Sequence, residues 1–238
     1  MVPAMGDDGF WVVHHDLPRE GPGLPEDVRW ALELAATPAQ ARICDAACGP
    51  GADTQTLIEE RPEAVVEALD LVPQFVEAAQ KRCPTAKIEI GDFSNLTGPF
   101  DLIWCAGAVY FLGVTEALTA WRPALAPGAR VAFSEPAWLS DAPSDAARAF
   151  WEDYPNITGL PGIEARVGAA GFRSLGHRML VGSPWKTYYD PMQERLDRLR
   201  ANADPDLLPA LDEAQREIDL WRAASDEIAY ALLVVEPR

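Results

Sequence analysis

The chain has 238 residues, 48% of them hydrophobic and 24% charged, which predicts a folded domain with a sizeable core and excludes fibrous and disordered chains. Its 20 basic and 37 acidic residues give a formal charge of −17, so nucleic acids and anionic membrane surfaces are poor partners and a small molecule is a better one. The four cysteines lack the spacing of a zinc site, which indicates reduced thiols and no bound metal.

We expect no secretory signal at the beginning of the chain. Residues 1–15 include Asp7 and Asp8 and lack the basic start of a secretory signal peptide. Nowhere does an apolar stretch approach the roughly 20 residues that a membrane-spanning helix requires. We therefore expect a cytoplasmic protein that has no membrane partner.

Apolar runs of strand length alternate with helical periodicity from about residue 26 to residue 180, which is typical of a parallel sheet. The predicted strands are residues 42–46, 64–70, 86–91, 100–105, 129–135 and 172–181. The predicted helices are residues 26–36, 53–60, 74–82, 115–125 and 159–171. Residues 187–225 have two apolar stripes at three- and four-residue spacing, which predict an antiparallel helix pair, and residues 228–235 predict a last strand.

The most informative segment is residues 43–54, in which a strand passes through the turn Gly49-Pro50-Gly51 into a helix. Glycines in such a turn let a ligand approach the backbone closely. The segment lacks the lysine of a triphosphate-binding loop, and Asp45 and Asp53 would repel the pyrophosphate of a dinucleotide. The same two carboxylates suit a ligand that carries an ammonium and a sulfonium.

This segment resembles the first motif of class I S-adenosylmethionine-dependent methyltransferases, in which an acid precedes small residues and a Cys-Gly-x-Gly turn. Three later segments also resemble motifs of that family: Ala68-Leu69-Asp70-Leu71, Gly91-Asp92-Phe93 and residues 100–107. The turn at residues 125–130 resembles the family's Leu-x-Pro-Gly-Gly turn. The chain departs from the family pattern at Ala47 and Ala129, where glycine is usual. The resemblance covers about residues 26–180.

The resemblance implies an α/β fold with a Rossmann-like, doubly wound, seven-stranded, mostly parallel sheet. It implies a single domain made of an N-terminal lid or arm (1–25), a Rossmann-like core (26–182), a helical-hairpin insertion (183–225) and a final strand (226–238). It also implies that Asp70 accepts the ribose hydroxyls and that Asp92 holds the adenine amino group. The cofactor-binding residues implied in this way are Asp45, Ala47, Cys48, Gly49, Asp70, Leu71, Asp92, Phe93, Cys105, Gly107 and Tyr110.

The implied reaction is transfer of a methyl group from S-adenosylmethionine to a small-molecule acceptor by in-line displacement, with S-adenosylhomocysteine as product. In such a reaction the protein mainly positions the two reactants, and a base is needed only if the acceptor must lose a proton. His14, His15 and Tyr188 are the candidate bases. The identity of the acceptor and the choice between monomer and homodimer stay open.

The stretch Leu17-Pro18-Arg19-Glu20-Gly21-Pro22-Gly23 resembles a lead-in found in a bacterial subgroup of small-molecule methyltransferases. It predicts a lid over the cofactor, with Arg19 a candidate ligand of the methionine carboxylate. Aromatic side chains can form the wall of an acceptor pocket, and they can equally fill a core. The candidates for that wall are Trp11, Trp185, Tyr188 and Tyr189.

Two other functions fit parts of the pattern. A nicotinamide-dependent oxidoreductase on a Rossmann domain is disfavoured by Asp45 and by the missing third glycine. A non-catalytic module that binds S-adenosylmethionine without turning it over has the same motifs and stays open.

Overall fold

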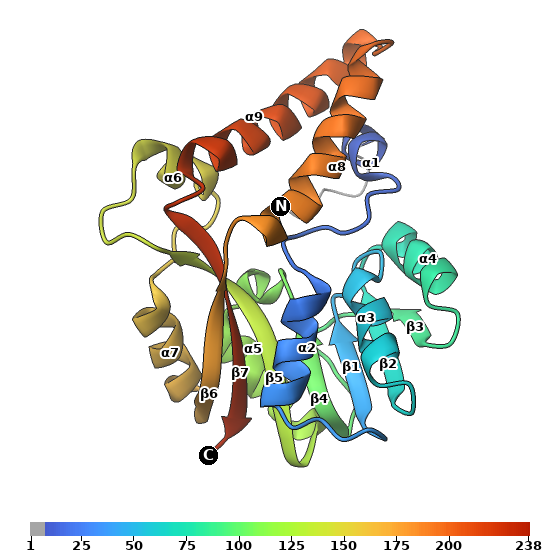
Figure 1. The fold of residues 1–238 in the computed structure, drawn as a ribbon, viewed down its shortest axis with the longest axis vertical. Coiled ribbons are helices and arrows are strands. Elements are labelled where there is room, and N and C mark those ends of the chain that lie inside the picture. Colours follow the sequence, from blue (N-terminus) through green and yellow to red (C-terminus); the bar gives the residue numbers. More distant parts are fainter. Residues whose placement is uncertain (1–7) are drawn as a thin grey trace.

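The computed structural model describes residues 8–238 and contains a mixed sheet of seven strands (Figure 1). The strands are β1 (Arg42–Ala46), β2 (Val65–Asp70), β3 (Lys87–Ile90), β4 (Phe100–Cys105), β5 (Leu125–Trp138), β6 (Phe172–Leu180) and β7 (Ile228–Pro237). Their order in the sheet is β3-β2-β1-β4-β5-β7-β6, and β7 runs antiparallel to both of its neighbours. The other pairs are parallel, which confirms the predicted α/β fold class.

The helices of the described residues are α1 (Asp8–His14), α2 (Pro25–Leu34), α3 (Ala52–Glu60), α4 (Pro73–Arg82), α5 (Val114–Trp121), α6 (Asp145–Phe150), α7 (Leu160–Ala169), α8 (Ser183–Arg200) and α9 (Leu208–Ala224). Three short 3₁₀ turns, η1 (Val109–Phe111), η2 (Arg122–Ala124) and η3 (Pro205–Leu207), join them to neighbouring elements. Many of the helices carry a proline in the first turn, where the missing N–H leaves no hydrogen bond unmade.

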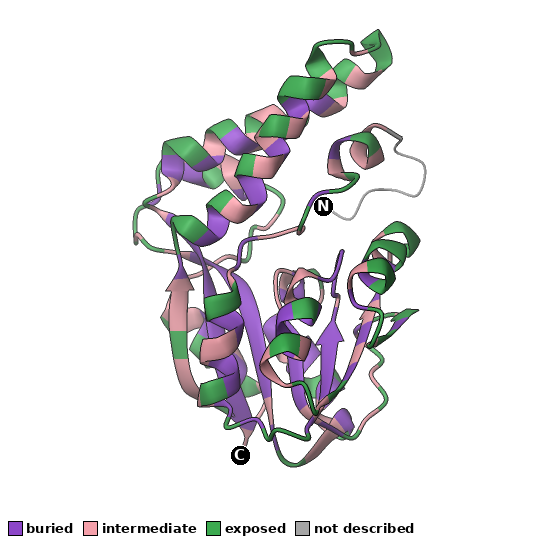
Figure 2. Cartoon of the chain, turned by 45° about the vertical axis from the view of Figure 1, so that its right-hand side comes forward, coloured by how far each residue is buried: buried purple, intermediate pink, exposed green. Residues whose placement is uncertain are grey.

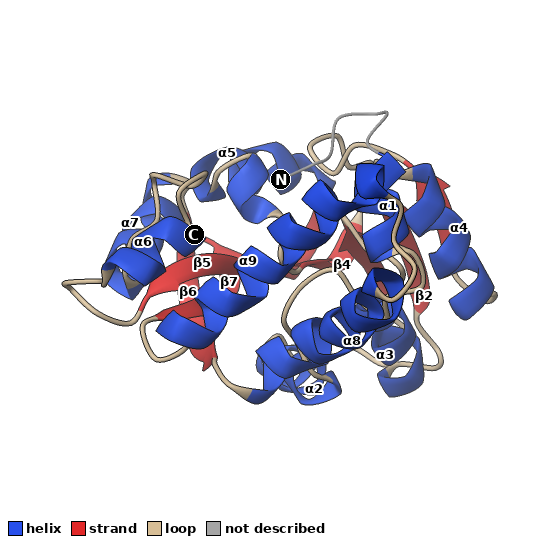
Figure 3. Ribbon diagram, turned by 90° about the horizontal axis from the view of Figure 1, so that it is seen from above, coloured by secondary structure: helices blue, strands red, loops and turns tan. Residues whose placement is uncertain are grey.

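Helices cover both faces of the sheet, so the strands read as continuous apolar runs (Figure 3). Packing of α2, α3 and α4 covers one face, while α5 and α7 cover the other. In β7 the nine residues 228–236 are all buried. Figure 2 shows this pattern as buried strands between helices whose outer sides are exposed.

Helices α8 and α9 form an antiparallel pair above the carboxyl ends of the parallel strands (Figure 1). The side chains of Gln193 and Gln215 bond to each other between the helices, and Arg200 donates to the carbonyl of Leu211. Between residues 8 and 238 no helix is long and apolar enough to cross a membrane.

The structure differs from the expected elements mainly at short or irregular places. Helices α1 and α6 have 7 and 6 residues, too few for a periodic pattern to stand out from the sequence. Helix α5 ends at Trp121, four residues earlier than expected, where the chain continues into the 3₁₀ turn η2; Pro123 in that turn has no N–H to extend the helical hydrogen bonds. Strand β5 extends to 14 residues because β7 pairs with its second half. Residues 1–7 of the predicted arm lie outside the described residues.

A buried carboxyl group lies in β5, two residues beyond the position that pairs with the last residue of β4. Glu135 is 5% exposed and faces Arg166 of α7 at 3.5 Å, while its Oε2 has no hydrogen-bond partner. Burial raises the pKa of Glu135 from an ordinary value of 4.5 to about 7, against the opposing effect of Arg166. The ionised form therefore destabilises the fold.

Replacement of this group, Glu135→Gln, should stabilise the protein above neutral pH. The carboxyl ionises at a lower pH in the unfolded chain than in the fold. The free energy of unfolding therefore falls by up to about 3 kcal/mol as pH rises from about 4.5 to about 7. Chemical unfolding should give equal free energies for the two proteins near pH 4 and a more stable variant near pH 8. Glu89→Gln, at an exposed position in β3, is the matched control and should show no such difference.

Candidate functional site

A cavity of about 400 Å³ lies where the carboxyl ends of β1, β2 and β4 meet the arm and the helix pair. Its floor comes from the turn after β1, the ends of β2 and β4, and the turn after β3. Its walls come from residues 10–22, the segment 149–154, and α8 and α9. Ligands of open parallel sheets bind at this edge, where the strand order reverses between β1 and β4.

The turn after β1 has a backbone that side chains rarely adopt. Gly49 and Gly51 have positive φ angles of 52° and 83°, and Ala47 has one of 65°. A Cβ at Gly51 would lie 3.0 Å from the Cβ of Ala79, so this glycine lets α3 begin against α4. The left-handed backbone at Ala47 costs about 1–2 kcal/mol, a strain that the surrounding structure holds at the floor of the cavity.

Asp45, at the end of β1, is a buried carboxyl to which no cationic side chain of residues 8–238 bonds directly. It is 1% exposed and accepts a hydrogen bond from the Thr54 hydroxyl at 2.5 Å. Burial raises the pKa of Asp45 to about 8; the carboxylates of Asp53 and Asp70 act in the same direction, while the Thr54 hydrogen bond and the charge of Arg19 oppose it. A ligand ammonium beside these three carboxylates would lower that cost, so the donor set fits an amino-acid ligand.

Asp70, at the end of β2, ties the two strand ends together. Its Oδ2 accepts a hydrogen bond from the Gly49 N–H at 2.9 Å, and its Oδ1 accepts one from Val72 at 2.9 Å. The Leu71 N–H also bonds to this carboxylate, which leaves one of its roughly four acceptor positions for a ligand hydroxyl. Leu71 and Phe93 line the cavity beside it.

Arg19 fastens the arm to the sheet. Its guanidinium pairs with Asp53 at 2.9 Å and donates to the carbonyls of Gly21 and Gly23 within the arm. The indole N–H of Trp104, in β4, donates to the other oxygen of Asp53 at 3.2 Å. The sequence did not predict this pair, which joins residues 34 positions apart. Arg19 also lines the cavity, and its predicted role toward a methionine carboxylate stays a prediction.

Helix α1 closes one side of the cavity. Trp11 packs edge-on against Phe75 of α4 at 5.4 Å, and Arg195 of α8 donates to the carbonyl of Val12. His14 lies against Phe10 and bonds through Nδ1 to Glu20 at 2.6 Å. The arm therefore contacts both the sheet layer and the helix pair.

The opposite wall is aromatic. Trp151 and Trp185 pack against Tyr230 of β7 at 5.7 and 5.5 Å, and Tyr154 packs against Tyr110 at 4.6 Å. The Tyr110 hydroxyl shares hydrogen bonds with those of Tyr154 and Tyr230. Sequence reasoning missed Trp151, Tyr154 and Tyr230, because the first two lie in an irregular segment and the third in a buried strand, where an aromatic residue gives no separate signal.

Most of the predicted site residues line this one cavity. They are Arg19, Asp45, Ala47, Cys48, Gly49, Asp70, Leu71, Phe93, Gly107 and Tyr110, with His14, Trp185, Tyr188 and Tyr189. Trp185, Tyr188 and Tyr189 are also buried in the core beside the helix pair, and their role in binding an acceptor stays a prediction. Burial raises the pKa of Tyr188 well above its ordinary value, and the Glu217 and Glu20 carboxylates act in the same direction, which disfavours this phenol as a base.

Four predicted residues do not line the cavity, each for a local reason. Asp92 is exposed and accepts a hydrogen bond from Ser94 in its own turn at 2.8 Å. Cys105 points to the other side of β4 from Trp104, into the core beneath α5. His15 is exposed beside Asp16, and Trp11 lies over α4.

All four cysteines are free and buried. Burial raises the pKa of each thiol, to about 11 at Cys83 and further at the other three. Only the uncharged thiol is therefore populated at neutral pH. Cys48 lines the cavity as a small apolar group.

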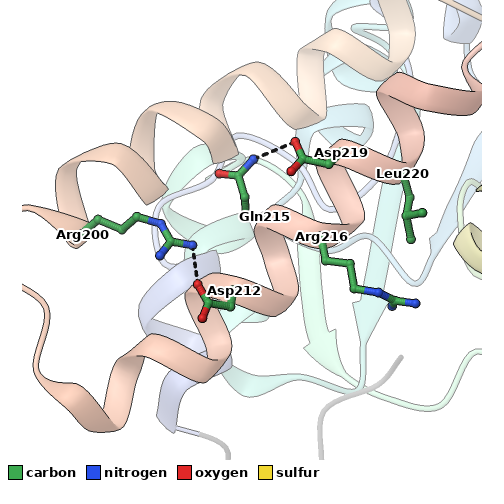
Figure 4. Close-up of a pocket in the computed structure, with 6 residues that line it drawn as sticks. All are labelled: Arg200, Asp212, Gln215, Arg216, Asp219 and Leu220. Atoms are coloured by element: carbon green, nitrogen blue, oxygen red, sulfur yellow. Dashed lines mark hydrogen bonds and ion pairs between the residues drawn. The ribbon is translucent and has the colours of Figure 1, made fainter.

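A second hollow, of about 380 Å³, lies on the outer side of the helix pair (Figure 4). Its lining consists of Arg200, Asp212, Gln215, Arg216, Asp219 and Leu220. Arg200 pairs with Asp212 at 2.8 Å, and Gln215 bonds to Asp219 at 3.1 Å, so these groups satisfy one another. No strand end contributes to this hollow, and the cavity above the sheet is the candidate site.

Comparison with known proteins places the chain in a family. A family model described as a methyltransferase domain matches residues 43–128. A trans-aconitate 2-methyltransferase from Mycobacterium sp. (strain KMS) is 31% identical over 215 residues, covering 77% of this chain and 83% of that protein. The chain belongs to the class I S-adenosylmethionine-dependent methyltransferases. A trans-aconitate 2-methyltransferase from Methylobacterium nodulans is also 31% identical, but over 142 residues that span 52% of its length.

Solved structures agree in fold. An S-adenosylmethionine-dependent methyltransferase from Thiobacillus denitrificans, in complex with S-adenosylhomocysteine, superposes with a TM-score of 0.85 at 20% identity over 100% of this chain and 99% of that one. A methyltransferase from Geobacter sulfurreducens gives a TM-score of 0.85 at 19% identity over 97% and 98%. Membership of this family favours methyl transfer over nicotinamide-dependent oxidation and makes S-adenosylmethionine the cofactor.

Binding of S-adenosylhomocysteine, which has the same ammonium as the cofactor, should strengthen as pH rises to about 8. Below that pH the pKa of Asp45, about 8, means that a proton must leave before the ammonium binds, so affinity falls by up to about tenfold per pH unit. Affinity should then level off until the ligand amine, whose own carboxylate keeps it protonated to higher pH than a peptide terminus, loses its charge. Calorimetry across this range, in buffers of different ionisation enthalpy, measures both the affinity and the proton released.

Asp45→Asn is the control variant for this measurement. It should bind the ligand more weakly near pH 8 and lose the rise in affinity between about pH 6 and about pH 8. A wild-type affinity that is flat over the same range would mean that the ammonium does not bind beside Asp45.

Proposed function

We propose that this protein transfers the methyl group of S-adenosylmethionine to a small molecule bound in the cavity above the sheet. One observation carries the proposal: a single cavity joins the acidic strand ends, Asp45 and Asp70, to an aromatic wall that includes Trp151, Tyr188 and Tyr230. The first part suits the cofactor, and the second suits a small acceptor.

For the cofactor, we assign the ammonium to the carboxylates of Asp45 and its neighbours, because Asp45, Asp53 and Asp70 together outnumber the one guanidinium beside them, that of Arg19. The ribose is assigned to Asp70, whose carboxylate faces the cavity and keeps an acceptor position beyond its backbone bonds. The adenine is assigned to the surface formed by Leu71 and Phe93, which line the cavity next to Asp70.

Bound S-adenosylmethionine supplies a methyl group on a sulfonium, which an acceptor displaces in line. The chain's own residues position the acceptor and exclude water. The Gly107 N–H donates to the Ser134 hydroxyl at 2.8 Å, which fixes the turn after β4. Tyr110 follows on that turn and is held by the hydroxyls of Tyr154 and Tyr230. A well-oriented pair of reactants gains about 7–11 kcal/mol from such positioning alone.

The relatives named for trans-aconitate support a small molecule as acceptor. The formal charge of −17 supports a partner other than nucleic acid. The four free cysteines support a location in a reducing compartment, for which we propose the cytoplasm. Monomer and homodimer are both compatible with the cavity, since the residues that line it come from one chain.

Saturating S-adenosylmethionine or S-adenosylhomocysteine should raise the melting temperature. Ligand at 100 times its Kd stabilises the native state by about 2.7 kcal/mol. For a chain of this size that corresponds to about 5–11 °C. Asp70→Ala should lose most of the shift because the turn after β1 loses its tie to β2 together with the proposed ribose contact. NADH serves as the negative control, and a shift with NADH alone would contradict the proposal.

Acceptor-dependent release of S-adenosylhomocysteine distinguishes an enzyme from a module that only binds the cofactor. We expect release to depend on an added small molecule and to stop in Asp45→Asn. Binding without release for every acceptor class, anionic, neutral and cationic, would favour the non-catalytic module.

A further inference from the structure

The charges that line the cavity are strongly unbalanced. Its carboxylates belong to Glu20, Asp45, Asp53, Asp70, Glu152, Asp153, Glu213 and Glu217, and its guanidinium groups belong to Arg19 and Arg216. Each arginine is already paired, Arg19 with Asp53 at 2.9 Å and Arg216 with Glu152 at 3.0 Å. A tricarboxylate such as trans-aconitate would bring more negative charge to a wall that is already acidic.

These carboxylates fall into two groups by their place in the fold. Asp45, Asp53 and Asp70 lie at or just beyond the ends of β1 and β2, where the amino-acid and ribose parts of the cofactor are assigned. Of the others, Glu213 and Glu217 lie on α9 and Glu152 and Asp153 follow α6, on the side of the aromatic wall. Glu20, on the arm, lies against the turn after β1, since a Cβ at Gly49 would be 3.9 Å from its side chain, and its charge also acts on Tyr188. The carboxylates of α9 and of the segment after α6 need an explanation other than the cofactor.

Glu217 lies among buried aromatic rings. Its Oε1 accepts a hydrogen bond from the Tyr189 hydroxyl at 2.7 Å, and Tyr189 packs against Tyr188 at 4.8 Å. The charge of Glu217 adds to burial in raising the pKa of Tyr188 and of Tyr230. The hydrogen-bond partner of this carboxylate is therefore a neutral phenol, which does not balance its charge.

Glu20 provides a second acidic group with an unused oxygen. Its Oε2 bonds to His14 at 2.6 Å, whereas its buried Oε1 has no hydrogen-bond partner. Burial raises the pKa of Glu20, with Glu217 and Asp70 acting in the same direction. A ligand that donates N–H groups would satisfy this oxygen and offset the charge.

Aromatic faces and carboxylates together bind ammonium groups, because the ring quadrupole and the carboxylate both attract a cation. The rings of Trp151, Trp185, Tyr188 and Tyr230 supply such faces. The same wall offers an anion neither a free guanidinium nor an ammonium among residues 8–238.

We propose that the acceptor is a small amine, held as its ammonium by Glu217, Glu20 and the aromatic wall, and that its nitrogen receives the methyl group. This inference rests on the proposed function. The ammonium first passes a proton to a carboxylate, and the freed nitrogen lone pair then forms the N–CH₃ bond. The S–CH₃ bond breaks with its electron pair going to sulfur, so the products are the methylated ammonium, S-adenosylhomocysteine and one proton in excess.

The test measures binding to the full chain saturated with S-adenosylhomocysteine. The probes are matched sets on one skeleton: 2-phenylethylamine, 2-phenylethanol and 3-phenylpropionate, and isobutylamine, isobutanol and isovalerate, together with trans-aconitate. We expect the amine of at least one set to bind at least about tenfold more tightly than its alcohol and its carboxylate. Tighter or equal binding of the carboxylates or of trans-aconitate, or no amine binding at millimolar concentration, overturns the proposal.

Charge-removing variants test the assigned residues. Glu217→Gln and Glu20→Gln should each reduce the preference for amine over alcohol severalfold. Glu217→Gln, on α9 and away from the turn after β1, should also leave the Kd of S-adenosylhomocysteine unchanged. Asp219→Asn, on the outer side of the same helix, is the matched control and should keep the preference. An unchanged preference in both test variants overturns the proposal. So does a loss of S-adenosylmethionine affinity with unchanged S-adenosylhomocysteine affinity, because the carboxylates would then serve the cofactor sulfonium.

The proposed function and the proposed acceptor class are tested separately by these measurements. If the wild-type chain does not bind S-adenosylhomocysteine, the proposed function itself is wrong. If it binds S-adenosylhomocysteine and shows no preference for amines, only the acceptor class is wrong. Melting curves of the variants without ligand verify that each is folded before its affinities are compared.

Discussion

The hydrogen bond from the Gly49 N–H to Asp70 joins the ends of β1 and β2, and the floor of the cavity depends on it. A second bond, from the Cys48 N–H to the carbonyl of Leu69, holds the same turn. With the turn fixed, its left-handed backbone at Ala47 and Gly49 is maintained and Asp45 stays buried beneath it. The fold thus holds carboxyl groups together against their mutual repulsion, and a cationic ligand relieves that repulsion.

The floor of the cavity, formed by the strand ends and the turns that follow them, could be predicted from the sequence because its signals are local. The strands β1 and β4 have the predicted bounds, since each is a short apolar run that ends at a turn of small residues. The topology of a parallel sheet brings the ends of β1 and β2 to one edge. It therefore also brings together Asp45 and Asp70, at the ends of these strands, and Gly49, in the turn after β1. Cys105 does not line the cavity, and the reason is equally local. It is adjacent to Trp104, which does, and adjacent residues of a strand point to opposite faces.

The walls of the cavity, formed by the arm, the aromatic residues and the helix pair, could not be predicted in the same way, because they depend on contacts between distant parts of the chain. Tyr230 reaches the cavity only because β7 inserts between β5 and β6. Arg19 finds Asp53 across 34 positions, and Glu217 meets Tyr189 across 28. No periodicity or motif identifies contacts between residues so far apart in the sequence. From the sequence alone, an aromatic residue at these positions is interpreted as ordinary core and an acidic one as solvent-exposed surface.

The burial of every cysteine has a practical consequence for observing the arm. Because thiolates and not thiols react with maleimides, the four native cysteines should not react with such reagents in the folded protein. A single cysteine introduced at Val12, an exposed position of α1, would then be the selective attachment point for a fluorophore. The fluorophore would report whether the arm moves during ligand exchange, without removal of any native cysteine.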